Sequence, residues 1–137
     1  MVPVVIYLLW PSDEARIKKL FREGSRAIEK KDLEAVMTGI SFNYRDEYGF
    51  TYLYIREALK SFLKRMKDIN VEYENLDIKV RDRTATADMD VRVIAAAGND
   101  TGYILGDMPH PAHLKFTLEK ERTEWLVTKT EGLPSRY

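Results

Sequence analysis

Residues 87–93 read Ala-Asp-Met-Asp-Val-Arg-Val, so apolar and charged side chains alternate along this stretch. Successive side chains of a strand point to opposite faces of a sheet, and this alternation is therefore typical of a strand with one buried face. The same period of two recurs at 76–80, 114–118 and 125–127. From Asn70 onward the sequence thus predicts at least four antiparallel strands, each with one face in the core and one toward water.

Before Asn70 the apolar side chains instead recur three and four residues apart, which is the period of a helix. Ser12 is placed to cap a first helix of about 18 residues, Asp32 a short second helix and Thr51 a third. Helices that precede a run of strands indicate an α+β fold. We therefore predict three N-terminal helices packed on one face of a strongly curved antiparallel sheet of four to six strands.

The connections carry their own signals. Residues 81–83 and 120–123 predict hairpin turns, and Gly98–Gly102 predicts a longer turn. Residues 41–44 predict a short extended piece between the second and third helices.

Composition limits the function. The chain has 137 residues, which suits one domain with one core. Its 22 basic and 22 acidic side chains give a formal net charge of zero, which argues against a nucleic-acid partner. The absence of cysteine excludes disulfides, thiolate metal sites and a cysteine nucleophile. No phosphate loop, nucleophile elbow or zinc-binding helix motif occurs, and we expect no cofactor. These features assign no compartment.

The N-terminal stretch Val2–Trp10 is an unbroken apolar run. It is too short to span a bilayer, which takes about 20 residues. One interpretation is a strand or extended arm that packs on the core or on a second subunit. Others are the stub of a membrane anchor or signal, or an artefact of the start site. We treat residues 1–11 as an arm or anchor stub and 12–137 as a single domain, with a membrane tether only if the run belongs to an anchor.

The order of elements supports a family resemblance. A long helix, a short helix opening with Lys-Asp-Leu-Glu-Ala-Val-Met at 31–37, a short strand, a third helix and long strands resemble the nuclear-transport-factor-2-like superfamily over about Asp13–Gly132. This superfamily includes ketosteroid isomerase, scytalone dehydratase and the polyketide cyclases. The resemblance implies a cystatin-like cone with a deep internal pocket. It also implies a homodimer, because related cones often pair through the sheet. The same cone serves enzymes, carriers and protein-binding modules.

Aromatic residues gather between the second and third helices, where the resemblance places the mouth of the pocket. A tyrosine combines an apolar ring with one polar group and suits a mostly apolar ligand. The alternative is a loop that aromatic rings anchor to the core, with their hydroxyls in water. Trp125 should face the helices and form part of the wall. We therefore predict that Tyr44, Tyr48, Tyr54 and Trp125 bind the ligand; the aromatic cluster is Phe42, Tyr44, Tyr48, Phe50, Tyr52 and Tyr54.

The sequence does not favour catalysis. Chemistry of the ketosteroid-isomerase type needs a carboxylate base, a tyrosine and a neutral acid. The matching positions fall near Gly24, Tyr44 and Leu114. The position of the base carries the Tyr44 phenol, and the other two carry no group that could donate a hydrogen bond. Asp46 as a carboxylate base and His113 as an imidazole acid–base are weak catalytic candidates.

His113 raises two further questions. A dehydratase-like pairing with Asp88 or Asp90 is conceivable across the sheet, but strand parity places both carboxylates on the face opposite the apolar one. Asp107, His110 and His113 are of the types that bind Zn²⁺ or Fe²⁺. However, two prolines hold their segment extended, and we predict a rigid loop and no metal site.

Three functional hypotheses remain open. The first, which we favour, is non-catalytic binding of a small, mostly apolar or aromatic ligand. The second is an interaction or accessory domain, and the third is a lyase- or isomerase-type enzyme on the same cone. The basic residues Arg56, Lys60 and Lys64 lie on one side of the third predicted helix and are expected to form a solvated face.

Overall fold

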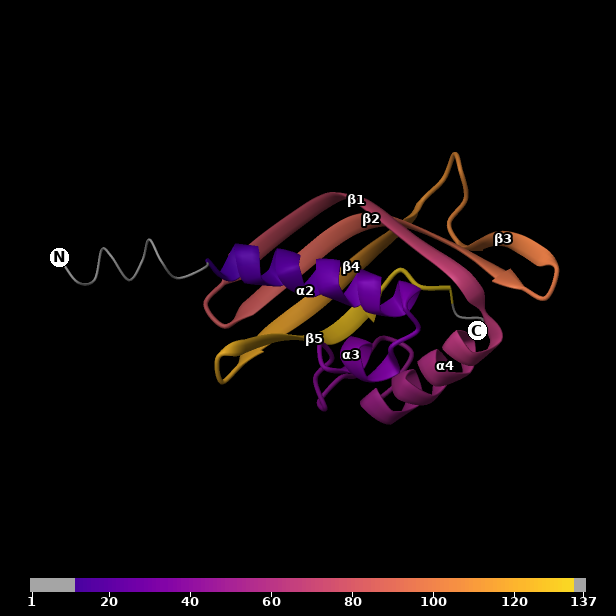
Figure 1. Ribbon diagram of the computed structural model, residues 1–137. Coiled ribbons are helices and arrows are strands. Elements are labelled where there is room, and N and C mark those ends of the chain that lie inside the picture. The colour runs from indigo at the N-terminus through magenta and orange to yellow at the C-terminus, as the bar shows by residue number, and fades with distance from the viewer. Residues whose placement is uncertain (1–11, 135–137) are drawn as a thin grey trace.

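The computed structural model describes residues 12–134, and the apolar run Val2–Trp10 lies outside them. Within this range the helices come first and the strands follow (Figure 1). No helix among the described residues is long and apolar enough to cross a membrane. The helices are α2 (Asp13–Glu29), α3 (Leu33–Met37) and α4 (Tyr52–Arg65); the strands are β1 (Lys67–Arg81), β2 (Thr84–Ala97), β3 (Asp100–Leu105), β4 (Ala112–Glu121) and β5 (Glu124–Glu131).

Each helix begins at the side chain that the sequence indicates. The Ser12 hydroxyl accepts a hydrogen bond from the Ala15 backbone N–H at 3.1 Å, and the Asp32 carboxylate accepts one from Ala35 at 3.2 Å. The Thr51 side chain accepts from the Tyr54 backbone N–H at the start of α4. Such caps satisfy N–H groups that have no partner inside the helix. The predicted helix starts are confirmed.

The sheet has five antiparallel strands in the order β1-β2-β4-β5, with β3 paired to β2. Strand β2 pairs with β1 along one edge. Along its other edge, residues 84–91 pair with β4 and residues 93–97 pair with β3. The predicted α+β class and number of strands are confirmed.

Two sequence predictions are wrong in detail. The turn expected over Gly98–Gly102 covers only Gly98 and Asn99, and β3 begins at Asp100. Gly98 has a φ of +64°, which permits so tight a turn. Of the residues of β3 only Leu105 is buried, so this edge strand lacks the alternation that the other strands show.

The extended piece expected over residues 41–44 is interrupted by a turn at Phe42 and Asn43. The Ser41 hydroxyl accepts a hydrogen bond from the Asn43 backbone N–H at 3.0 Å, and such local bonds favour turns. Only an isolated parallel bridge joins Ile40 to Val127 of β5.

The helices lie on one face of the sheet, and α2 runs across the strands (Figure 1). Ile17 of α2 is fully buried, and the Phe21 ring meets the Phe116 ring of β4 with centroids 5.0 Å apart. On β2 the residues that face the helices are Ala85, Ala87, Met89 and Val91, all buried. The alternation that the sequence displays at 87–93 therefore does separate core from solvent.

We predict that Gly132 after β5 tolerates no side chain. Its φ is +98°, and an added Cβ would overlap the carbonyl oxygen of His113. Gly49 also has a positive φ, of +78°, but space for a Cβ. In urea denaturation, Gly49→Ala should cost about 1 kcal/mol of unfolding free energy, the cost of the left-handed backbone alone. Gly132→Ala should cost at least about 2 kcal/mol because the overlap is added. Equal losses would contradict this prediction.

Candidate functional site

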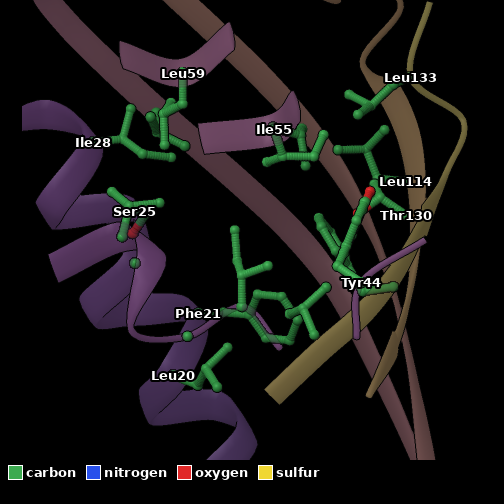
Figure 2. A pocket seen from close by; sticks show the side chains of 18 of the residues that line it. Leu20, Phe21, Ser25, Ile28, Tyr44, Ile55, Leu59, Leu114, Thr130 and Leu133 are labelled. Carbon is green, nitrogen blue, oxygen red and sulfur yellow. The ribbon is translucent and has the colours of Figure 1, made fainter. Parts of the chain in front are cut away.

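The helices do not fill the cone. Between them and the inner face of the sheet lies a cavity of about 1110 Å³ (Figure 2). Ligand-binding cavities commonly measure 300–1,000 Å³. Most of the side chains in Figure 2 are hydrocarbon, and the labelled apolar ones are Leu20, Phe21, Ile28, Ile55, Leu59, Leu114 and Leu133.

Periodicity explains why this wall is apolar. Leu20, Gly24 and Ile28 follow one another at four-residue intervals on α2, and Ile55 and Leu59 do so on α4. The same stripes that pack the helices on the sheet therefore also line the space that the packing leaves open. Gly24 widens that space, because a Cβ placed there would meet no atom within 4 Å.

Tyr44 supplies a polar group at one end of the cavity, beside Thr130 (Figure 2). Its side chain is only 3% exposed, and its hydroxyl donates a hydrogen bond to Oδ2 of Asp46 at 3.0 Å. Burial raises the pKa of the Tyr44 phenol far above its ordinary value, and the Asp46 carboxylate adds to this rise while Thr130 opposes it. The phenol is therefore neutral and keeps its proton.

Asp46 is 7% exposed and accepts hydrogen bonds from three donors. Besides the Tyr44 hydroxyl, these are the backbone N–H groups of Tyr48 at 3.0 Å and Phe50 at 3.1 Å, both to Oδ1. This carboxylate folds the segment from 46 to 50 and orients the phenol. The sequence placed it as a weak candidate for a base, but its acceptor positions serve the fold.

Tyr48 and Tyr54 lie on the cavity wall and are partly exposed to solvent. The Tyr48 hydroxyl donates to the Leu133 backbone carbonyl at 2.9 Å. The Tyr54 ring stacks on Phe50 with centroids 4.1 Å apart. Phe42, by contrast, is 82% exposed and does not line the cavity. Within the aromatic cluster, four residues therefore line the cavity: the buried Tyr44, and Tyr48, Phe50 and Tyr54. Phe42 and Tyr52 do not line it.

Trp125 is buried and lines the cavity from β5. Its indole N–H donates to Oδ1 of Asp13 at 3.0 Å, and the Lys120 ammonium contacts the same oxygen at 3.1 Å. The hydrogen bond from Trp125 lowers the pKa of Asp13, with help from Lys120 and against the effect of burial. Trp125 therefore also ties the beginning of α2 to the last strand.

His113 lies on the outer face of the sheet, away from the cavity. Its Nε2 is 3.0 Å from Oδ1 of Asp88 and its Nδ1 is 3.1 Å from Oδ1 of Asp90, while its side chain is 63% exposed. Asn75 donates to the other oxygen of Asp90. Strand parity thus gives the correct face, and the structure separates this imidazole from the cavity by the thickness of the sheet.

The three residues considered for a metal do not come together. The His110 Nδ1 atom is 3.6 Å from Oδ1 of Asp107, whereas His113 contacts carboxylates of β2. Within residues 12–134, no group of three or more His, Cys, Asp or Glu side chains is arranged so that it could hold a metal ion.

Solved structures share this architecture. An NTF2-like protein with a cystatin-like fold from Novosphingobium aromaticivorans superposes with a TM-score of 0.69 at 14% identity, over 94% of this chain and 84% of that one. A cystatin-like protein of unknown function from Nostoc punctiforme superposes with a TM-score of 0.64 at 16% identity, over 86% and 87%. This chain has the nuclear-transport-factor-2-like (NTF2-like) fold. The resemblance seen in the sequence is therefore confirmed at the level of the fold.

A further NTF2-like neighbour is a protein provisionally named a scytalone dehydratase, also from Novosphingobium aromaticivorans, with a TM-score of 0.68 at 13% identity over 88% of this chain and 87% of that one. No protein-family profile and no curated protein matches the chain. At such identities the NTF2-like fold is shared, and the chemistry has to be argued from this chain's own residues.

One polar residue of this NTF2-like cavity escapes sequence reasoning. Trp125 and Val127 face inward, so strict alternation would place Lys129 inward and Thr130 outward. In the structure Thr117 of β4 pairs with Lys129 and Leu118 pairs with Val127, so that Thr128 is an extra residue on β5. This bulge shifts the period, and Thr130 is buried instead. The apolar helical stripes were visible in the sequence, but they indicated core as readily as cavity.

The His113 cluster of this NTF2-like sheet makes stability depend on pH. Hydrogen bonds to Asp90 and then Asp88 raise the pKa of His113, and bonds from Asn75 and then His113 lower the pKa of Asp90. A raised histidine pKa contributes stability that is fully present below the unfolded value of 6.5 and is lost as pH rises through the folded value.

We therefore predict that His113→Gln lowers the free energy of unfolding more at about pH 5.5 than at about pH 8.5. Urea denaturation of both proteins at the two pH values measures the difference. Because the cluster is exposed, about 1 M NaCl should shrink the effect. A loss that is the same at both pH values, or larger at the alkaline one, would contradict the assignment.

Proposed function

We propose that this protein binds a small, largely apolar molecule in the interior of the cone without transforming it. The observation that carries the proposal is the cavity of about 1110 Å³ behind α2 and α4, whose walls are mostly hydrocarbon. A closed core would have favoured the interaction domain instead. The predicted binding residues Tyr44, Tyr48, Tyr54 and Trp125 all line this cavity.

The expected affinity follows from the buried area. A ligand that removes ~250 Å² of its apolar surface from water gains ~6 kcal/mol at ~25 cal/mol per Å². One hydrogen bond to a wall hydroxyl adds ~1 kcal/mol. Losses of translational and rotational freedom subtract several kcal/mol. The sum of ~7 kcal/mol before that subtraction corresponds to a dissociation constant of roughly 10 μM, so we expect micromolar binding at the tightest and no nanomolar binding.

Two placements favour binding over catalysis. The Asp46 carboxylate, which faces the cavity, already accepts three hydrogen bonds and holds a loop together. The His113 imidazole lies on the other side of the sheet. An acid–base reaction needs a group that gains or loses a proton beside the substrate, and neither weak candidate is free to do so there.

Gly24 offers a direct test. A Gly24→Phe side chain would enter the cavity from α2, whereas Gly24→Ala adds only a methyl group. Both replace a helical glycine, so each should be at least as stable as the wild type, with a gain of up to about 1 kcal/mol for alanine. In equilibrium dialysis with neutral two-ring aromatic compounds, Gly24→Phe should bind at least about tenfold more weakly than Gly24→Ala.

Equal affinities of the two variants would place the ligand outside the cavity. Failure of the wild type to bind any compound of a broad apolar panel would overturn the proposal and leave the interaction domain as the better account. Thermal melts of the variants show that each is folded before the affinities are compared.

We also propose that the protein is a homodimer paired through the sheet. The outer faces of β2 and β4 are long, and pairing would bury more than ~1,000 Å² in total, the lower range for a specific interface. Light scattering at tens of micromolar protein should give twice the chain mass of 16.0 kDa. The mass of a single chain at that concentration would count against the dimer.

A further inference from the structure

Several hydroxyl groups line the cavity. Four of them make hydrogen bonds in which the protein itself takes the proton. Ser25 and Thr38 donate to backbone carbonyls of their own turns, at 2.9 and 2.7 Å. Tyr48 donates to the Leu133 carbonyl, and Tyr44 donates to Asp46. These four oxygens therefore have lone pairs left for a ligand, while their protons are already taken.

We propose that the cavity selects apolar ligands that carry a hydrogen-bond donor, namely an alcohol or a phenol, and that Tyr44 is the residue that accepts from them because Asp46 takes its proton. This inference rests on the proposed function and specifies its ligand class. It reverses the usual expectation for a buried tyrosine, whose hydroxyl more readily donates to a carbonyl.

The direction of the Tyr44 hydrogen bond is fixed by its partner. A carboxylate only accepts, so the proton on the bond between Tyr44 and Asp46 belongs to the phenol. The other carboxylate oxygen is held by the backbone N–H groups of Tyr48 and Phe50, and the side chain cannot turn away. If the phenol gave its proton to a ligand, a buried oxygen of Asp46 would lose its partner.

Thr130 does not change the polarity. It is buried beside the Tyr44 hydroxyl at the same end of the cavity (Figure 2). The Thr130 side chain lowers the pKa of the phenol as a hydrogen-bond donor does, so the proton of its hydroxyl is taken by the phenol oxygen. Whichever of the two oxygens meets the ligand, an acceptor is what the ligand finds. A ketone or an ether would place lone pairs against lone pairs.

Three compounds with one apolar body test the inference: 4-hydroxybiphenyl, 4-methoxybiphenyl and 4-acetylbiphenyl. Equilibrium dialysis against the full chain gives three dissociation constants. The wild type should bind the phenol about fivefold to tenfold more tightly than either analogue.

The variants assign this preference to the Tyr44–Asp46 pair. Tyr44→Phe removes the acceptor, and the ratio between phenol and ketone should fall at least about fivefold. Asp46→Asn should invert the ratio. The amide oxygen keeps the backbone N–H groups of Tyr48 and Phe50, so its NH₂ group donates to the phenol and frees the phenol's proton for a carbonyl. Tyr103→Phe is the matched control, because this tyrosine contacts Met108 and lies outside the cavity wall.

The outcomes separate the two proposals. If none of the three compounds binds the wild type, the proposed function fails and this inference with it. If they bind with equal affinity, or the ketone binds best, the cavity binds ligands but the inference is overturned. An unchanged ratio in Tyr44→Phe overturns it as well. Should one variant fail to fold in a thermal melt, the other still gives a distinct result, loss of the preference or its inversion.

Discussion

Three strands pair with β2 through backbone hydrogen bonds, and the shape of the sheet depends on how the two edges of β2 are divided among them. One edge of β2 pairs with β1 along most of its length. The other edge is divided between β4 and β3, with the change of partner at Arg92. The Arg92 guanidinium donates to the carbonyls of Asp107 and Met108, in the loop that connects those two strands. A single charged side chain thus satisfies the backbone where the sheet divides.

This divided sheet leaves room that the helices do not fill. Two short polar networks fix the position of the cavity walls at separate places. At one, Trp125 and Lys120 bind Asp13 and fix the beginning of α2. At the other, Asp46 orients Tyr44 and the loop that follows. Because every buried side-chain nitrogen and oxygen within residues 12–134 has a hydrogen-bond partner, the cavity can remain largely apolar without unpaired side-chain groups in its wall.

Much of the fold could be predicted because local rules agree with each other here. The caps at Ser12, Asp32 and Thr51 and the alternation on β2 fixed three helix starts and the buried face of the sheet. Strand β3 was missed because it is a short edge strand in which only Leu105 is buried, so it lacks the alternation that identifies a half-buried strand.

The candidate site was harder to predict for the same physical reason. A leucine or isoleucine on a helical stripe looks identical in sequence whether it meets another side chain or an open space. The sequence pointed to Tyr44 and Trp125 through their chemistry, but the partners that set their roles, Asp46 and Asp13, became apparent only in three dimensions. The partners of His113 show the converse, since parity alone placed Asp88 and Asp90 on the face opposite the apolar one.

The bulge at Thr128 also bears on how such a protein could change over evolutionary time. Gain of one residue between Thr128 and Lys129, with the bulge kept, would shift the register and put the side chain of Lys129 opposite Phe116, where Thr130 now lies. The core positions Trp125 and Val127, which precede the bulge, would keep their place. A single codon gained here would therefore exchange a hydroxyl for a cation inside the cavity and leave the core that precedes the bulge unchanged.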